Sequence, residues 1–261
     1  MLGKLLKYEF KASSRILIPL YLILLITTGI NRLILQLDIF DGPLSVIPII
    51  MKTLFTLSVI TILITTFLLM IYRFYKNLLS DEGYLMFTLP TKTHQLIISK
   101  YLATLLWGIV SVIIIVVSVA LAFGTPENIK LFINNVKEYF VQLEIASGES
   151  TIVTIFTLLL LCLMTLTTYI LLIYTAIAIG QLFTKNKLVG AFVSYIGINT
   201  IMQILILLVL VFTNAFQFID NSNTNMIPVK LALSIIAFQF IASTVFFIIT
   251  NTIFQKKLNL E

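Results

Sequence analysis

Long intervals without charged residues alternate with short polar stretches along the whole chain. A helix needs roughly 20 apolar residues to cross the hydrocarbon core of a bilayer, and a charge near its centre is costly. Five of these intervals are long enough to supply a spanning helix, and the first, between Arg15 and Arg32, is shorter. The pattern predicts six transmembrane helices, at residues 15–36, 50–72, 97–123, 150–184, 188–212 and 230–254.

Two further segments have apolar residues at helical spacing but are too polar to span. In residues 1–14 the apolar positions share a helix with Lys4, Lys7 and Lys11, which predicts a helix lying in the inner membrane interface with its cations toward anionic lipid. A cytoplasmic extension of the first span explains the same pattern, and both interpretations stay open. In residues 126–148 the spacing predicts an amphipathic helix on the outer membrane face.

Composition agrees with a membrane protein. The 261 residues are 59% hydrophobic and 11% charged, whereas soluble domains are roughly 45–50% apolar and 25% charged. The net charge of +6 comes from basic residues at the ends of apolar runs and not from one soluble face, so no nucleic-acid partner is expected. We therefore predict an all-α integral membrane protein that forms a single transmembrane domain over residues 1–261.

Orientation follows from the lysine and arginine residues of the short connections. With the N-terminus inside, the outer segments carry only five basic residues: Arg32, Lys52, Lys130, Lys137 and Lys230. The inner segments carry twelve: Lys4, Lys7, Lys11, Arg15, Arg73, Lys76, Lys92, Lys100, Lys185, Lys187, Lys256 and Lys257. This bias predicts that both termini are cytoplasmic.

Residues 73–96 form the predicted cytoplasmic loop between the second and third spans. Apolar and charged side chains interleave in this loop, and Gly83 and Pro90 can end short helical pieces. A plain connection needs only a few polar residues, as at 184–187. Apolar groups and charges of both signs on short rigid pieces are typical of a surface that docks another protein. The alternative is that these residues only cap a helical hairpin.

The loop motifs resemble a known family. Asp81-Glu82-Gly83-Tyr84-Leu85, Thr88-Leu89-Pro90 and Ser99-Lys100 are similar to the intracellular signature of ABC transporter permeases, in particular the six-span type-two exporters of Gram-positive bacteria. The resemblance covers the whole chain in span count and loop lengths, and in specific residues it depends on positions 73–100. It implies a coupling helix that docks an ATPase subunit through Lys76, Leu79, Asp81, Glu82, Gly83, Tyr84, Phe87 and Pro90.

The same resemblance implies the partners. The chain contains no Gly-x-x-x-x-Gly-Lys-Ser/Thr phosphate loop, so we expect a transporter subunit that is not itself an enzyme and holds no cofactor. Two ATPase chains would bind ATP and Mg, and two permease chains would pair with each other or with a sister chain in a bacterial plasma membrane. The expected cargo is a hydrophobic or amphipathic peptide, either a toxin or an antimicrobial peptide expelled for resistance. Lipids and hydrophobic drugs stay open, and so does a non-transporting scaffold or sensor.

Few residues inside the spans carry other chemistry. Asn199 and Gln203 lie at positions i and i+4 of the fifth span, where they can line a translocation path or a dimer seam, or serve as hydrogen-bond links between helices. No ionisable residue lies well inside a predicted span, which disfavours ion-coupled transport. A single histidine, His94, and a single cysteine, Cys162, disfavour a transition-metal site. An ion channel is disfavoured because no ring of charges is visible.

Overall fold

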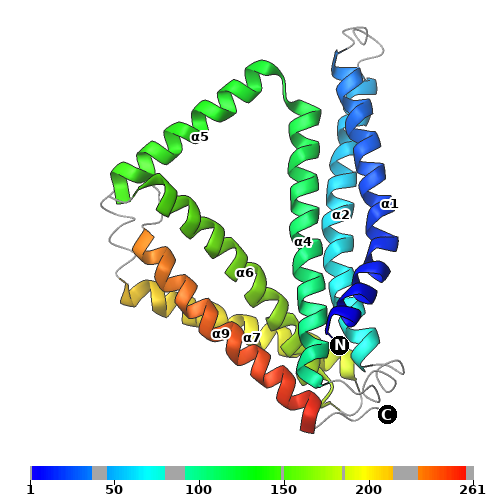
Figure 1. Ribbon diagram of the computed structural model, residues 1–261, viewed down its shortest axis with the longest axis vertical. Helices are drawn as coiled ribbons and strands as arrows, with labels where there is room; N and C mark the ends of the chain where they lie inside the picture. The colour runs from blue at the N-terminus through cyan, green and yellow to red at the C-terminus, as the bar shows by residue number, and fades with distance from the viewer. Residues whose placement is uncertain are drawn as a thin grey trace. The chain divides into compact units, whose positions relative to one another are not determined.

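A computed structural model describes residues 2–36, 46–79, 92–147, 150–183, 186–213 and 229–256. Within these ranges the chain is all-α, with seven helices and no strand (Figure 1). The helices are α1 (Leu2–Gln36), α2 (Val46–Leu79), α4 (Thr93–Phe123), α5 (Pro126–Ser147), α6 (Thr151–Gly180), α7 (Lys187–Phe212) and α9 (Val229–Lys256).

Six of the seven helices are long and apolar enough to cross a membrane, and α5 is the exception. The predicted fold class is confirmed at this level: the chain is a multi-pass, all-helical membrane protein. Each predicted span falls on one helix, although α1 begins well before its predicted limit and α2 extends beyond both of its limits. Helical hydrogen bonding does not stop where the hydrocarbon stops, so charge-free intervals understate helix length.

The N-terminal segment continues directly into the first span. One helix runs from Leu2 to Gln36, without a break near residue 14. This continuity agrees with the interpretation of residues 2–14 as an extension of the span, whereas their depth in the membrane stays a prediction. Pro19 lies inside this helix, where proline removes a backbone donor and kinks the chain. The first turns of α1, in dark blue, are inclined to the rest of the helix (Figure 1).

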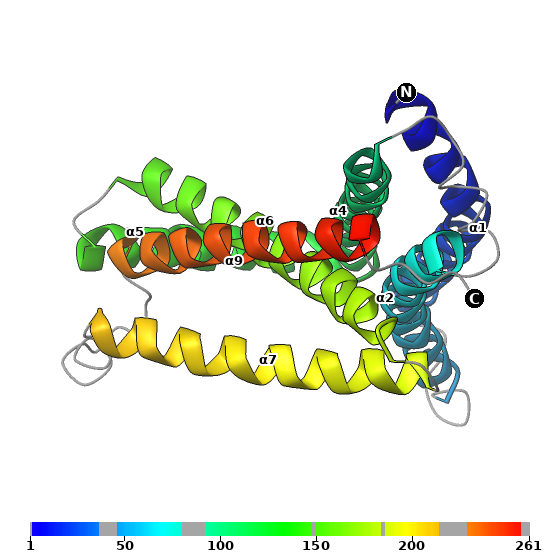
Figure 2. The same ribbon diagram turned by 90° about the horizontal axis from the view of Figure 1, so that it is seen from below.

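The chain divides into two compact units, which are described separately. The first contains Met1–Lys76 and Gln95–Phe132, and the second contains Asn77–His94 and Ile133–Glu261. In the first unit α1, α2 and α4 lie side by side (Figures 1 and 2). Their core contains Leu17, Tyr21, Leu24, Phe55, Ile62 and Ala122, with Trp107 packed against it.

Helices α1 and α4 run parallel in a nearly constant register. Two side-chain contacts between them, and a third from α1 to the carbonyl of Gly124 directly after α4, join residues that are 91, 90 and 92 positions apart in the chain. A constant separation requires that both helices run in the same direction. The buried face of α4 is rich in small side chains, which allow helix backbones in a membrane to approach closely. These small residues are Ser99, Ala103, Thr104, Ser111, Ser118 and Ala122.

In the second unit α6 packs against α7 and α9. Gly180, at the end of α6, faces the backbone of Ala191 on α7, and a Cβ at position 180 would collide with it. Glycine is therefore required at this approach of the two helices. Threonines on α6 link it to α9: the Thr175 and Thr250 hydroxyls are 3.0 Å apart, and Thr175 also contacts the Phe246 carbonyl at 3.1 Å.

Helix α5 confirms the helix predicted at residues 126–148. It begins at Pro126, a favoured first helical residue. The preceding Thr125 caps it, since its hydroxyl accepts a hydrogen bond from the Asn128 amide at 3.2 Å. Most of its side chains are exposed. Its position on the outer membrane face stays a prediction.

Candidate functional site

The predicted ATPase-docking surface lies mostly outside the described residues. Lys76 is exposed on α2, with its ammonium 5.6 Å from the centre of the Tyr72 ring. Leu79 is the last residue of α2. The other six predicted docking residues, Asp81, Glu82, Gly83, Tyr84, Phe87 and Pro90, fall in the range 80–91, which the structure does not describe.

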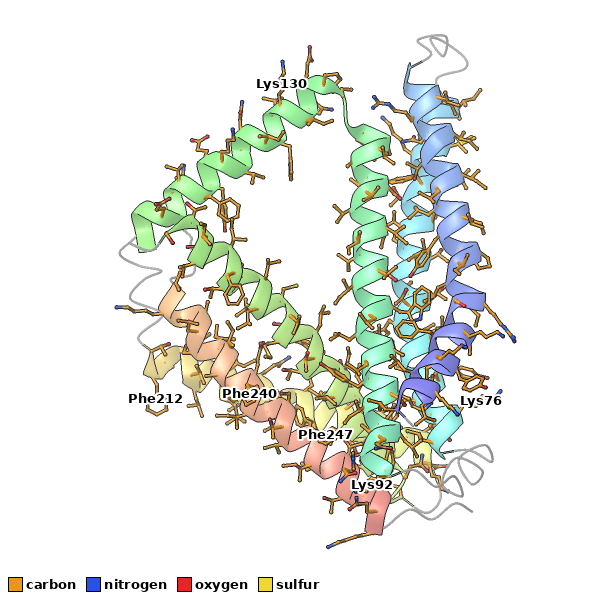
Figure 3. All side chains as sticks on the ribbon, viewed as in Figure 1. Lys76, Lys92, Lys130, Phe212, Phe240 and Phe247 are labelled. Atoms are coloured by element: carbon orange, nitrogen blue, oxygen red, sulfur yellow. The ribbon has the colours of Figure 1, made fainter. Side chains whose placement is uncertain are left out.

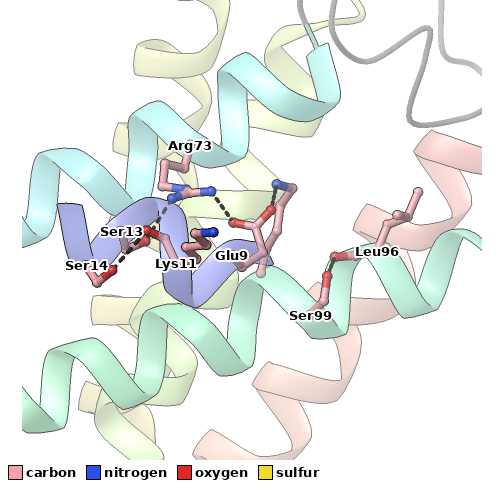
Figure 4. A network of polar contacts seen from close by, with 8 residues as sticks. Glu9, Lys11, Ser13, Ser14, Arg73, Leu96 and Ser99 are labelled. Carbon is pink, nitrogen blue, oxygen red and sulfur yellow. Dashed lines mark hydrogen bonds and ion pairs between the residues drawn. The ribbon is translucent and has the colours of Figure 1, made fainter. Parts of the chain in front are cut away.

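A largely buried group of charged and polar residues lies on α1 and on the two helices, α2 and α4, that flank this range. We call Glu9, Ser13, Arg73 and Lys100 the ionic cluster (Figure 4). Glu9 on α1 is bonded through both carboxylate oxygens: Oε2 lies 2.8 Å from Arg73 Nη2, and Oε1 lies 2.7 Å from Lys100 Nζ. Arg73 Nη1 also donates to the Ser13 hydroxyl at 3.0 Å. The cluster therefore joins α1, α2 and α4.

Burial makes each member of the ionic cluster depend on the others. Glu9 is 6% exposed and Lys100 is 3% exposed. Removing ions from water costs several kcal/mol each unless they are paired and hydrogen-bonded, and breaking a buried pair typically costs about 3–5 kcal/mol. Glu9 is the carboxylate that binds both cations of the cluster, the buried Lys100 and the half-buried Arg73.

The ionic cluster lies close to the ends of the helices. Arg73 is less than two turns from the end of α2, and Lys100 is about two turns after the start of α4. Toward the other end of α1, Arg32 Nη1 donates to the Gly124 carbonyl at 2.9 Å. The helix rise between Glu9 and Arg32 is about 35 Å, close to the roughly 30 Å of a hydrocarbon core. The separation of the two charged levels is therefore close to the thickness of a hydrocarbon core.

Between these levels a hydroxyl triad links the same three helices. Tyr21 Oη and Ser111 Oγ are 2.7 Å apart, and Ser111 Oγ and Thr66 Oγ1 are 3.0 Å apart. All three residues are buried. Hydrogen bonds of this kind between membrane helices contribute about 0.6 kcal/mol on average. The first unit is thus connected by polar contacts at three depths, with apolar packing between them.

The second unit contains a polar cavity of about 100 Å³ between α6, α7 and α9. This polar cavity is lined by nine residues: Thr165, Thr168, Tyr169, Leu172, Asn199, Met202, Gln203, Ile206 and Gln239. The predicted pair Asn199 and Gln203 therefore faces one cavity, together with a third amide, Gln239 of α9. None of the nine lining residues is Asp, Glu, Lys, Arg or His.

The three amides of the polar cavity differ in their partners. Gln239 is 7% exposed, and its Nε2 donates to the Thr165 hydroxyl of α6 at 3.0 Å. It is a hydrogen-bond link between helices. Asn199 is half-buried and Gln203 is exposed, and within the described part of the chain neither side chain has a hydrogen-bond partner.

The polar cavity lies at mid-depth of its helices. Asn199 is at the middle of α7, Thr165 is at the middle of α6, and Gln239 is about one turn from the middle of α9. Phe240, which follows Gln239 on α9, is exposed at this depth (Figure 3). The cavity is therefore at the depth where polar groups are least favourable in a bilayer.

Sequence reasoning missed the ionic cluster. Glu9 is an isolated acid among the lysines of α1, and its pairing with Arg73 and Lys100 was not predicted. A signal was present, because all three residues fall on the predicted cytoplasmic side at the ends of three consecutive spans. An acid there can meet both cations only if the three helices pack together.

Other chemistry is not evident in the described ranges, where no group of three or more His, Cys, Asp or Glu side chains could hold a metal ion. Comparison of the chain with protein-family models, with curated proteins and with solved structures finds no match.

Proposed function

We propose that this chain is the permease subunit of an ATP-driven exporter of the ABC type, which moves hydrophobic or amphipathic peptides out of the cell or its membrane. The observation that carries the proposal is the ionic cluster at the base of the 73–96 loop. Arg73 and Lys100 lie on the two helices that this loop joins, and both bind Glu9 of α1. A loop held on such a base can act as a rigid lever.

A lever is what coupling to a separate ATPase requires. Moving a two-state gate from 1:99 to 99:1 takes roughly 5.5 kcal/mol of differential binding. A flexible loop would dissipate that difference, whereas a loop fixed to three packed helices transmits its displacement to the membrane-spanning part. An ATPase docked at Glu82 and Tyr84 would then displace α2 and α4. The ionic cluster would transmit this displacement to α1.

The proposed assembly contains two copies of this chain, or this chain and a sister permease, with two ATPase subunits that bind ATP and Mg. Its place would be a bacterial plasma membrane with both chain ends in the cytoplasm. Apolar outer faces on the six helices and the uncharged polar cavity suit a cargo that enters from the membrane. Peptide toxins and antimicrobial peptides have this character.

The decisive experiment is co-purification of the tagged chain from its native membrane. We expect an ATP-hydrolysing subunit to accompany the wild type and to be lost from the variant Glu82→Ala plus Tyr84→Ala, although that variant still inserts. The matched control is Glu138→Ala plus Tyr139→Ala, which removes the same two side-chain types from exposed positions on α5. It should keep the partner.

Two results would contradict the proposal. One is a wild-type chain that brings no ATP-hydrolysing subunit with it. The other is equal recovery of that subunit from the wild type, the loop variant and the α5 control, which would leave a non-transporting scaffold or sensor as the better function.

A further inference from the structure

We infer that the polar cavity is a binding site for an uncharged hydrogen-bonding group, and specifically for the peptide bonds of an apolar peptide segment. This inference deepens the proposed function and rests on it in one respect, namely that the bound peptide is the cargo. The cavity itself is a property of the second unit alone, because α6, α7 and α9 supply all of its lining residues.

The contrast between Gln239 and the other two amides carries the inference. A polar side chain that only links helices is satisfied within the bundle, as Gln239 is by Thr165. Thr168 is satisfied in the same way, by the Met164 and Gln239 carbonyls at 2.8 and 3.3 Å. Asn199 and Gln203 have no such partner among the described residues. Two unpaired amides at the middle of a span lie where only an external partner can compensate them.

The hydrogen-bonding character of these amides selects the class of ligand. Each side-chain amide offers two N–H donors and one carbonyl acceptor, and Asn199 and Gln203 lie one turn apart on the same face of α7. Such a pair complements a group that itself carries both a donor and an acceptor, as a peptide bond does. A hydrocarbon chain would leave both amides unpaired.

The absence of charge in the lining excludes ionic ligands. No lining residue carries a formal charge, and a charge at the centre of a span costs about 2.5–3.5 kcal/mol on insertion scales. A charged headgroup would therefore find no counter-ion at this depth. An uncharged peptide segment avoids that cost.

Size and shape define how much of a peptide the polar cavity receives. Its volume of about 100 Å³ is several times the roughly 10–15 Å³ that one water needs, which leaves room for a peptide unit. Leu172, Met202 and Ile206 supply an apolar wall. Methionine adapts to different side chains, so the site recognises the backbone of a bound peptide more than the side chains of that peptide.

A second copy of the chain is a less suitable occupant. A seam between two copies of α7 would use the outer face of one helix, whereas this cavity is concave and draws its lining from three helices of one chain. The experiment below separates the two.

The test measures peptide binding to the full chain in lipid nanodiscs, without any ATPase. The probe is an uncharged Leu/Ala-rich peptide with blocked ends and one photoreactive side chain, and its competitor has the same sequence with N-methylated backbone amides. We expect cross-links to α7 and at least tenfold weaker competition by the N-methylated peptide. We also expect about tenfold weaker probe binding to Asn199→Leu plus Gln203→Leu, corresponding to about 1.4 kcal/mol.

Two variants keep the result interpretable. Gln203→Met removes one amide from an exposed position and conserves its length, so it should fold normally and bind the probe about three- to fivefold more weakly. Thr200→Val removes a polar group from a neighbouring exposed position on α7 that does not line the cavity, and its binding should equal that of the wild type.

Equal binding of the normal and N-methylated peptides would overturn the inference, as would unchanged binding to both amide variants. Loss of self-association in those variants with unchanged probe binding would assign Asn199 and Gln203 to a dimer seam, and would overturn it too. Co-purification of the ATP-hydrolysing subunit with these variants tests the proposed function separately. The substituted amides are distant in sequence from the predicted docking residues 76–90, so the variants should keep that subunit.

Discussion

Glu9 of α1 and Lys100 of α4 are 91 positions apart in the chain, yet their carboxylate and ammonium groups are 2.7 Å apart and both residues are buried. Arg73 of α2 occupies the other carboxylate oxygen. One side chain thus sets the positions of three helices at the level where the loop of residues 73–96 leaves the bundle.

Replacing Glu9 by Gln should destabilise the chain strongly. The substitution conserves size, but it removes the negative charge that binds both the Lys100 ammonium and the Arg73 guanidinium and puts a neutral amide in its place. Because breaking a buried ion pair costs about 3–5 kcal/mol, we expect a loss of that size in the free energy of unfolding, measured by denaturant titration in detergent micelles. Glu138→Gln removes an exposed acid from α5 and should change this free energy by less than about 0.5 kcal/mol.

A partial rescue provides the complementary check on the ionic cluster. Lys100→Met removes one of the two cations, so the double variant Glu9→Gln plus Lys100→Met should be more stable than Glu9→Gln alone. If the two losses in unfolding free energy simply add, Glu9 and Lys100 are not coupled and the cluster does not have the role assigned to it.

Tyr21→Phe tests the hydroxyl triad. It removes one hydroxyl and conserves the ring that packs near Trp107, while the contact between Ser111 and Thr66 at 3.0 Å can persist. We expect a loss of about 0.6 kcal/mol in unfolding free energy, with an upper limit of about 1.7 kcal/mol. Tyr8→Phe removes a hydroxyl from a side chain that is 70% exposed and should have no measurable effect. A larger effect at Tyr8 than at Tyr21 would contradict the structure.

Gly180→Ala should weaken the hairpin of α6 and α7. The added methyl group would meet the backbone of Ala191, which cannot move aside as a flexible side chain can. Overpacking of this kind costs about 1–3 kcal/mol. Gly197→Ala is the matched control, because a Cβ there meets no atom within 4 Å and alanine favours helix by about 1 kcal/mol. Thermal unfolding should therefore shift down for the first variant and stay level or rise for the second.

The orientation predicted from basic residues can be tested by cysteine labelling. In a Cys162→Ser background, Lys11→Cys and Lys76→Cys should react with a membrane-impermeant maleimide only from the cytoplasmic side, and Lys130→Cys only from the outside. All three lysines are exposed, and Lys76 and Lys130 lie at opposite ends of the first unit (Figure 3). Labelling of Lys76→Cys from outside would reverse the orientation and remove the basis for an inner docking loop.

The positions of the helices could be predicted from the sequence because the bilayer imposes a simple rule on charge and length. The helix at residues 126–148 was predicted by a different criterion, the helical spacing of its apolar residues. Helix ends were less predictable, since α1 continues through its lysine-rich turns to Leu2. The pairing of Glu9 was missed because ion pairs between distant residues depend on which helices pack together, and hydropathy carries no information about packing.

For the candidate sites too, the sequence predicts which residues share a helix face but not which helices pack together. The spacing of Asn199 and Gln203 predicted that they share a face, but the contribution of Gln239 and Thr165 from other helices could only come from the structure. The docking residues 81–90 were identified by motif resemblance, and their role stays a prediction.

The parallel register of α1 and α4 has a consequence for biogenesis. When the ribosome has made only the first hydrophobic segment, Glu9 lacks both of its partners on the other helices, and Tyr21 lacks Ser111. Arg73 arrives with the second segment, and Lys100 and Ser111 arrive only with the third. The polar contacts that hold the first helix in the bundle are therefore complete only after the third hydrophobic segment has been made.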